Sequence, residues 1–406
     1  MRLNITAETG RTLTLFAALA VTFVYLPFLA LLLVCVFSPW GRSRNLRWIF
    51  LLAACLLLCV LNTTKQVDGD LINYVRVQDY LAERPLLVLL QTDEMSGVNP
   101  TYRPTEMGFY AVQWLMAQLF DSSSASIAVA ATLAIYIPTF AAILLLARVK
   151  GWNDRLTLII ALVAFFAALN FNNTTNLLRQ YVSAAFALLA LVSYFDRKKL
   201  AAFAWALLSC SVHNGTAYLM ACFIALAWLF PFGRAFWTWG TVWRALCAIL
   251  VLGGSVAALW FHGINGLLES TDLSVWRYLV ALLLFAMFLY AARSRGFDRA
   301  DYYLSLAYSV IIFVSAAFYA MSLRVMALRY FVYLEGLYAP MVAAMLCAIP
   351  RRHLLAYLGS RWLVCCAAAC VFIFRVNNPP GGWTYGPDSA RVLTISAREA
   401  IEYIGT

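Results

Sequence analysis

Arg179 and Gln180 lie about one turn into an apolar run, residues 177–195. An arginine at that depth costs several kcal/mol to bury unless it is paired or faces water, so it is a candidate functional residue. A guanidinium in this position can bind an anion, and the amide of Gln180 can donate or accept a hydrogen bond. The structural alternative is an arginine that snorkels at a helix end, which the asparagines before it favour.

His213 closes the apolar run 200–213, and Asn214 precedes the next run, 215–230. A turn at this point would hold the imidazole at the ends of both segments. A histidine placed there can act as a base or donate a hydrogen bond to an oxygen. Helix capping or packing is the structural alternative.

Arg324 and Arg329 flank a short polar break before the apolar run 330–349. Arg329 and Tyr333 are four residues apart and share one face of a helix. Two arginines at one site can bind a diphosphate, because guanidinium groups match phosphate oxygens bidentately. Alternatively, Glu335 within the same run neutralises Arg329.

The longest polar stretch, residues 62–106, contains the best-placed carboxylates, Asp70 and Glu106. A carboxylate in a partly dry pocket can act as a general base toward a hydroxyl. Solvated loop charge or a helix N-cap is the alternative for each. So long a connection in a compact domain is functional or disordered, and its tyrosines and leucines argue against disorder. Three further candidate binding residues lie in it: Tyr74, Arg76 and Arg103.

Apolar segments must position these residues. Hydrophobic residues make up 64% of the 406-residue chain and charged residues only 12%, against roughly 25% charge in soluble domains. An apolar run of about 20 residues spans a bilayer core as a helix. The sequence therefore predicts an all-α polytopic membrane protein with about 11–13 transmembrane helices. The apolar runs lie at 12–37, 48–61, 107–120, 125–147, 156–171, 177–195, 200–213, 215–230, 245–262, 276–292, 302–320, 330–349 and 361–374.

Basic residues gather in alternate loops, near 42–47, 148–150, 197–199, 234–244, 293–299 and 351–352. The positive-inside rule places these loops in the cytoplasm, and the candidate residues then face the opposite side. The charge rule holds throughout if the run 107–120, with about 14 residues, is a re-entrant or interfacial helix instead of a span. The run 48–61 is equally short. We expect one transmembrane domain, residues 1–374, that includes a loop at 62–106 on the side opposite the cytoplasm, followed by a tail at 375–406 on that same side.

Metal and nucleotide sites have no support in the sequence. Walker A, GxGxxG and HExxH motifs are absent, and the ten cysteines lie in apolar runs without a CxxC pair. Because the chain has only three histidines, a zinc ligand set is not expected. We expect no cofactor, no metal and no nucleic-acid partner, because the basic residues are spread over short loops.

Several of these blocks, in this order, resemble the EpsG/Wzy type of polysaccharide (O-antigen and exopolysaccharide) polymerase. In that family an Arg-Gln pair opens a span, a basic turn follows, and a histidine closes the next run. The blocks that carry the resemblance cover roughly residues 66 to 340 and lie at 70–74, 106–109, 176–186, 197–199, 211–216 and 329–331.

The resemblance implies a GT-C-like, multi-pass glycosyltransferase of the bacterial inner membrane whose active site faces the periplasm. Such an enzyme transfers a growing glycan from undecaprenyl diphosphate to the sugar hydroxyl of another undecaprenyl-diphosphate-linked repeat unit. The implied partners are that lipid-linked oligosaccharide, membrane lipid, and a chain-length regulator and a flippase of the same pathway. No nucleotide sugar is needed.

The candidate residues suit this chemistry, because pre-positioned arginines stabilise the charge of a leaving diphosphate. The candidate catalytic residues are Arg179, His213, Glu106 and Asp70. The candidate binding residues are Gln180, Arg329, Arg324, Arg103, Arg76, Tyr74, Tyr333 and Asn214. Either a carboxylate or His213 would take the proton of the acceptor hydroxyl.

Three other functions are compatible with the sequence. An O-antigen ligase shares the architecture, and a polysaccharide acyltransferase would use His213 and Asn214 as its base. A lipid-linked sugar transporter or flippase belongs to a different class and would use the arginines to hold anionic cargo. Transporters often show paired repeats or helices broken at the midplane, whereas the charges here gather at one face.

Overall fold

The computed structural model describes residues 21–22, 25–37, 44–63, 65, 70–99, 102–120, 123–174, 177–232, 275–321, 323–350 and 352–377. Within these residues the regular structure is helical and no β-strand is present, which confirms the all-α polytopic class. Seven of the described helices are long and apolar enough to cross a membrane. They are α3 (Arg44–Thr63), α7 (Ser124–Lys150), α9 (Leu178–Phe195), α13 (Val275–Arg295), α14 (Arg299–Ala320), α15 (Arg324–Ala348) and α16 (Leu354–Asn377).

Shorter helices complete the described bundle. They are α2 (Pro27–Phe37), α8 (Asp154–Val163), α10 (Lys199–Val212) and α11 (Gly215–Leu229). Helix α8 continues into a π-helical turn at Ala164–Ala168, and a one-turn 3₁₀ helix follows at Phe171–Asn173. The predicted run 245–262, residues 12–20 and 23–24 of the first run and nearly all of the predicted tail 375–406 lie outside the described residues. The total of 11–13 spans therefore stays a prediction.

Ion pairs tie the basic loops together at one end of the bundle, which we call the basic end. Lys150 at the end of α7 lies 2.6 Å from Asp298 and 2.7 Å from Asp301, at the start of α14. Arg47 of α3 pairs with Asp154 at the start of α8. Gly151, with φ of 66°, ends α7 in the left-handed conformation that favours glycine. In the described part of the chain, the basic loops near 42–47, 148–150, 197–199 and 293–299 thus meet at one end, whereas the basic loop predicted at 234–244 lies outside the described residues.

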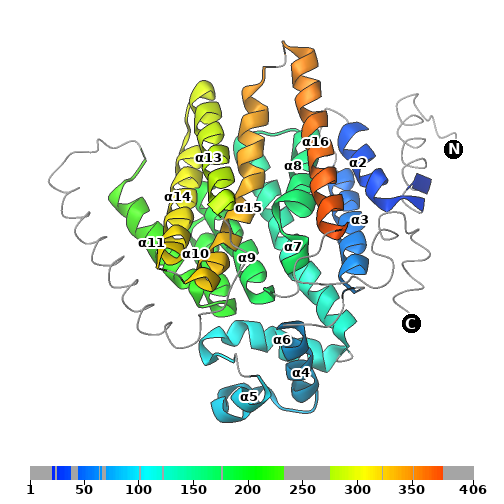
Figure 1. Cartoon of the computed structure of the whole chain (residues 1–406), viewed down its shortest axis with the longest axis vertical. Helices are drawn as coiled ribbons and strands as arrows, with labels where there is room; N and C mark the ends of the chain where they lie inside the picture. Colours follow the sequence, from blue (N-terminus) through cyan, green and yellow to red (C-terminus); the bar gives the residue numbers. More distant parts are fainter. Residues whose placement is uncertain are drawn as a thin grey trace, which may run out of the picture.

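The predicted loop 62–106 folds into a helical cap over the opposite end, which we call the site end (Figure 1). The cap contains α4 (Asp70–Ala82), α5 (Thr92–Val98), two short 3₁₀ segments at Leu86–Leu90 and Pro104–Glu106, and α6 (Met107–Leu119). In Figure 1, α6 lies across the ends of the longer helices and α7 begins beside it. The run 107–120 forms the 13-residue α6, which is not among the described helices that are long enough to span, whereas 48–61 lies within the 20-residue α3 and qualifies as a span.

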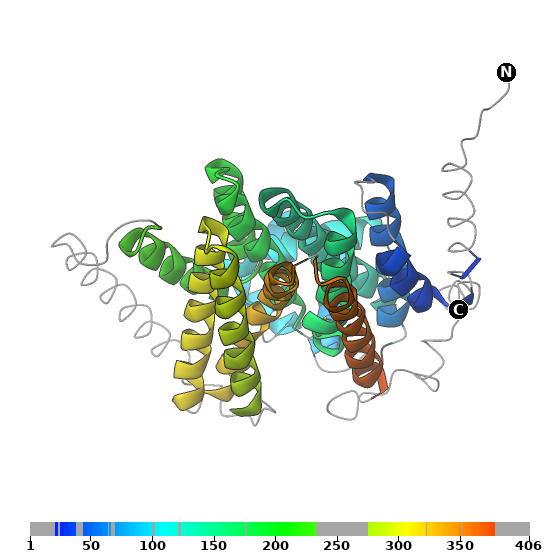
Figure 2. The ribbon, with the colours of Figure 1, turned by 90° about the horizontal axis from the view of Figure 1, so that it is seen from above.

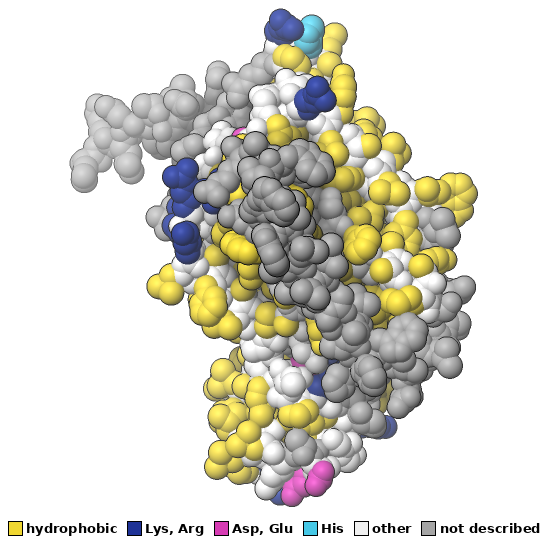
Figure 3. Space-filling view, turned by 90° about the vertical axis from the view of Figure 1, so that its left-hand side faces the viewer, with side chains coloured by type: hydrophobic (Ala, Val, Ile, Leu, Met, Phe, Trp, Pro, Cys, Tyr) yellow, Lys and Arg dark blue, Asp and Glu magenta, His cyan; other side chains and the backbone are white. Residues whose placement is uncertain are grey.

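Two helices at the centre of the bundle, α9 and α15, position the site. Seen from above, α15 stands between the α13–α14 pair and α16 (Figure 2). It packs against α9, α13 and α14, and α9 packs against α7 and α10. On the face shown in Figure 3, hydrophobic side chains cover much of the described surface, several basic groups lie in its upper half, and acidic groups gather at the lower tip. A polar group on the inner faces of α9 and α15 is consequently shielded from both water and lipid.

Candidate active site

Three candidate residues from distant parts of the chain meet at the site end. One carboxylate oxygen of Glu106 accepts a hydrogen bond from the guanidinium of Arg179. The other lies 2.6 Å from Nδ1 of His213. The exposed fractions are 0% for Glu106, 6% for Arg179 and 9% for His213, so water is nearly excluded from the three groups. The structure therefore brings together three of the four residues that the sequence analysis assigned to catalysis.

The charges of this trio follow from its contacts. Burial raises the pKa of the Glu106 carboxyl, but the hydrogen bond with His213 and the charge of Arg179 outweigh it and lower the pKa to about 2. Burial lowers the pKa of His213 below its ordinary value, although the bond to Glu106 opposes this. At neutral pH, Glu106 is therefore ionised and His213 is neutral.

The tautomer of His213 follows in turn. An ionised carboxylate only accepts hydrogen bonds, so Nδ1 carries the proton and donates to Glu106. Nε2 is then the basic nitrogen. It lies against Gly215, where an added Cβ would come within 2.9 Å of it. A carboxylate that fixes a histidine by Nδ1 and leaves Nε2 to take a proton is the arrangement of a general base.

Backbone features of the turn between α10 and α11 hold Glu106 in place. The backbone N–H of Asn214 donates to Glu106 Oε1 at 3.3 Å, so the carboxylate lies at the positive N-terminus of α11. The Asn214 side chain donates to Thr105 Oγ1 at 3.2 Å and joins the same two segments. Gly108 allows α6 to reach the end of α10, because a Cβ there would lie 2.8 Å from the Cβ of Ser211.

Aromatic side chains of the cap close the site around Arg179. Its guanidinium also donates to the hydroxyl of Tyr110 at 3.3 Å. Tyr74 is 1% exposed and packs against Phe109 with ring centroids 5.5 Å apart. Neither Tyr110 nor the role of Gly108 was predicted from the sequence. The one available signal was that Glu106 and Tyr110 are four residues apart, at the start of the α6 helix.

Arg329 lies near the trio but differs from Arg179 in its pairing. Within the described residues it forms no ion pair, and its buried Nε has no hydrogen-bond partner. Its strongest electrostatic neighbours are two further cations, Arg179 and Arg103, together with Asp70 and Tyr74. Asp70 lies in the first turn of α4 and is half-buried. The site thus holds more positive than negative charge around Arg329.

Glu335 does not neutralise Arg329, and that interpretation of the sequence was wrong. The carboxylate accepts hydrogen bonds from the backbone N–H of Asn170 and from the hydroxyl of Tyr181, both at 2.8 Å. The physical reason is helical geometry: residues six apart are rotated by about 240° and do not share a face.

The remaining candidates are spread around the trio. Gln180 is 3% exposed and follows Arg179 at the start of α9. Arg103 is exposed and directly precedes the 3₁₀ turn that contains Glu106. Arg76 is exposed on α4, on the opposite face from buried Tyr74, and the structure does not bring it to the trio. Arg324 begins α15, but its side chain lies outside the described part of the structure.

Tyr333 belongs to a buried cluster of hydroxyl groups directly below the trio. Its hydroxyl lies 2.5 Å from Thr216 Oγ1 and 3.3 Å from Ser183 Oγ. Ser183 in turn lies 3.0 Å from the hydroxyl of Ser209. This cluster joins α9, α10, α11 and α15 at the level where His213 turns, so it fixes the floor of the site. Among the described residues, no three metal-ligating side chains of the His, Cys, Asp or Glu type gather to hold an ion.

Comparison with known proteins gives one match. Neither a search of curated proteins nor a search of solved structures found a match, so the expected GT-C-like arrangement stays a prediction. The model of the EpsG family matches residues 47–378. This range covers most of the chain and includes every candidate residue from Asp70 to Tyr333. The protein therefore belongs to the EpsG family.

Proposed function

We propose that this protein is a polysaccharide polymerase that joins repeat units carried on undecaprenyl diphosphate. Family membership indicates a polysaccharide polymerase-type function in a multi-pass membrane protein. The observation that carries this proposal is the buried trio of Glu106, His213 and Arg179, together with Arg329, a nearby cation that forms no ion pair with the described residues. A base next to excess positive charge suits a hydroxyl that attacks a sugar with a diphosphate leaving group.

His213 is the base in this proposal. Its Nε2 takes the proton of the acceptor hydroxyl, while Nδ1–H stays bonded to Glu106. Glu106 itself is poorly suited to this role, because both of its oxygens already accept hydrogen bonds and its pKa is about 2. Asp70, which is half-buried and at the edge of the trio, helps to orient Arg329.

Arg329 and Arg103 bind the leaving diphosphate, and Arg179 has a different role. The charge of Arg179 is already matched by Glu106, so it chiefly orients the carboxylate and adds positive potential. Among the described residues Arg329 has no anionic partner at ion-pair distance, so its binding to a phosphate breaks no ion pair with them. Gln180 and Tyr74 then contact the sugar or phosphate oxygens.

The reaction balances without a cofactor. The acceptor oxygen forms a bond with the anomeric carbon of the donor glycan as its proton passes to His213. The bond between that carbon and the diphosphate oxygen breaks, and undecaprenyl diphosphate leaves with the electron pair. Arginine side chains placed before the reaction stabilise the charge that develops on it.

The basic end faces the cytoplasm in this proposal, and the site end faces the periplasm of a bacterial inner membrane. Support comes from the ion-paired basic loops, which lie at the end of the bundle opposite the trio. A flippase would supply repeat units on that side, and a chain-length regulator would act on the product.

The glycans of a strain that lacks this protein test the proposal. Loss of a polymerase leaves single repeat units, and complementation with Arg329→Ala should leave the same single units although the protein is inserted at normal levels. Long chains that stay on the lipid carrier would instead indicate a ligase. Chains of normal length without acyl groups would indicate an acyltransferase. Repeat units confined to the cytoplasmic face of the membrane would indicate a flippase.

A further inference from the structure

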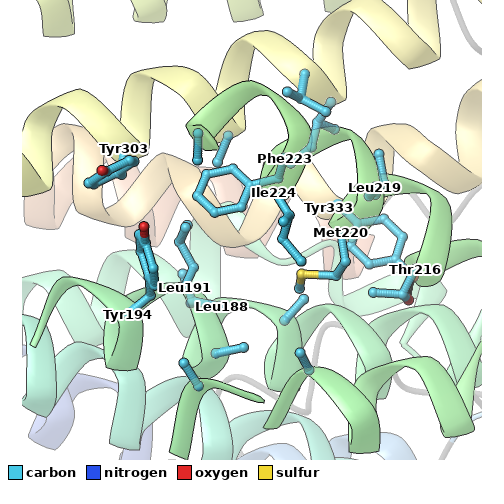
Figure 4. Close-up of a pocket in the computed structure, with 18 of the residues that line it drawn as sticks. Leu188, Leu191, Tyr194, Thr216, Leu219, Met220, Phe223, Ile224, Tyr303 and Tyr333 are labelled. Atoms are coloured by element: carbon cyan, nitrogen blue, oxygen red, sulfur yellow. Dashed lines mark hydrogen bonds between the residues drawn. The ribbon is translucent and has the colours of Figure 1, made fainter. Parts of the chain in front are cut away.

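An apolar groove with a volume of about 660 Å³ lies between helices of the bundle (Figure 4). Residues of α9, α10, α11, α14 and α15 line it. Alanines form much of one wall, with Ala184, Ala187 and Ala190 on α9. Larger side chains form the other walls, with Met220 and Phe223 facing inward in Figure 4. A space with these walls favours a hydrocarbon chain over a sugar.

The groove begins at the floor of the candidate active site. Thr216 and Tyr333, which belong to the hydroxyl cluster below His213, both line it. Along α15, Arg329 is followed at intervals of four by Tyr333 and Leu337, and the latter two line the groove. Residues four apart share a helical face, so one face of α15 passes from cation to phenol to aliphatic side chain. A lipid diphosphate bound at Arg329 would therefore place its tail in the groove.

The groove is open toward the lipid between α10 and α11. Three of its lining residues are large, apolar and exposed on the described surface: Phe203 is 61% exposed, Ile224 61% and Trp228 56%. Side chains that line the groove and are also exposed on the protein surface mark a lateral opening of the groove, through which a lipid tail can enter from the bilayer. From Thr216 to Trp228, α11 borders the groove for about 18 Å at ~1.5 Å per residue. That length covers more than half of a ~30 Å hydrocarbon core.

We propose that this groove binds the polyprenyl tail of the donor, the substrate whose diphosphate leaves. The inference rests on the proposed function, because it takes Arg329 as the diphosphate site. The occupant is the donor lipid instead of a bulk phospholipid, since the groove is continuous with the cation-rich site at one end and open to the bilayer at its side. The tail then holds the reacting carbon near His213 Nε2 while the acceptor arrives.

A tryptophan placed in the groove tests this proposal. Ala206 of α10 lines the groove, whereas Ala204 on the same helix does not line it and is exposed. Ala206→Trp should raise the KM for a donor with an undecaprenyl tail by about tenfold or more, because excluding even two buried methylene groups has that effect. The same variant should use a donor with a three-isoprene tail as well as the wild type does. Ala204→Trp is the matched control and should leave both KM values unchanged.

The experiments distinguish an incorrect groove assignment from an incorrect proposed function. If the wild type extends chains and Ala206→Trp keeps the wild-type KM for the long-tailed donor, the groove assignment is overturned and the function stands. If the wild type extends no chain, equilibrium binding of undecaprenyl diphosphate in nanodiscs decides. Weaker binding by Ala206→Trp alone supports the groove, and equal binding by all three proteins overturns it. If Ala206→Trp does not fold, Ala187→Phe on the opposite wall replaces it in both assays.

Discussion

Replacement of Glu106 by glutamine removes the charge that Arg179 and His213 share. The substitution keeps the shape of the side chain and one acceptor oxygen. It leaves the guanidinium of Arg179 buried without a counter-charge and takes away the carboxylate that fixes the Nδ1 proton of His213. We therefore expect both a less stable protein and a less active one.

The size of the stability loss follows from the pKa of Glu106. Its value falls from 4.5 to about 2 on folding, and a difference of about 2.5 units corresponds to about 3.4 kcal/mol. No discount for solvent screening applies, because the carboxylate is 0% exposed. Breaking a buried ion pair by removing one partner typically costs about 3–5 kcal/mol, which agrees. We expect Glu106→Gln to lower the free energy of unfolding by about 3 kcal/mol at pH 7.

The contribution of Glu106 to the free energy of unfolding depends on pH in a defined direction. A carboxyl whose pKa is depressed by folding contributes stability that is present above its unfolded pKa, near 4.5. That contribution is lost as the pH falls from about 4.5 toward 2. The difference in the free energy of unfolding between the wild type and Glu106→Gln should therefore be at its maximum at pH 7 and become smaller below pH 4.5.

Denaturant unfolding of the purified protein in detergent micelles at pH 7 and pH 3.5 measures this difference. Glu83→Gln is the matched control, because Glu83 is an exposed carboxylate of the same cap. It should change the free energy of unfolding by less than about 0.5 kcal/mol. Polymerisation by Glu106→Gln should fall by roughly 10²-fold or more, since the base loses its orientation. A variant as stable and as active as the wild type would refute the role given to this trio.

Three other predictions concern neighbouring residues. Because burial lowers the pKa of His213, kcat/KM should rise with pH through a pKa below 6.5 and stay flat from pH 7 to 8; a rate that falls over pH 6 to 8 would contradict His213 as the base. Gly108→Ala should destabilise the protein by about 1–3 kcal/mol because its Cβ meets the end of α10, whereas Gly97→Ala, with open space around it, should have little effect on the unfolding midpoint. Arg329→Ala should reduce polymerisation by more than tenfold. It should leave thermal stability unchanged, since Arg329 has no ion-pair partner among the described residues. A drop in Tm as large as that of Arg179→Ala would point to a structural role for Arg329.

The helices were predictable from the sequence because hydrophobic length is a local property. The runs at 125–147 and 302–320 correspond to α7 and α14, and the charge rule identified the run 107–120 as one that does not span. Outside the cap, the described helices from α3 to α11 and from α13 to α16 run between the two ends as the basic loops indicated. Such features depend only on composition within a window of about 20 residues.

The pairing of side chains was not predictable in the same way. Glu106 meets Arg179 and His213, which lie 73 and 107 residues further along the chain. One sequence carries no record of which distant residues face each other. From the sequence, the base could therefore be either a carboxylate or His213. The contacts of Glu106 with both Arg179 and His213 are what identify Glu106 as the orienting group and His213 as the base in the proposed mechanism. The apolar groove likewise depends on how five helices pack, which periodicity within each helix does not define.

The central claim is that the protein itself extends lipid-linked glycans at this site. Purified protein incubated with a synthetic undecaprenyl-diphosphate repeat unit, without nucleotide sugar, tests it most directly. We expect a ladder of products that differ by one repeat unit, with one undecaprenyl diphosphate released for each bond formed, and no ladder from His213→Ala. A wild-type protein that leaves every repeat unit single, or a ladder of equal length and rate from His213→Ala, would contradict the account.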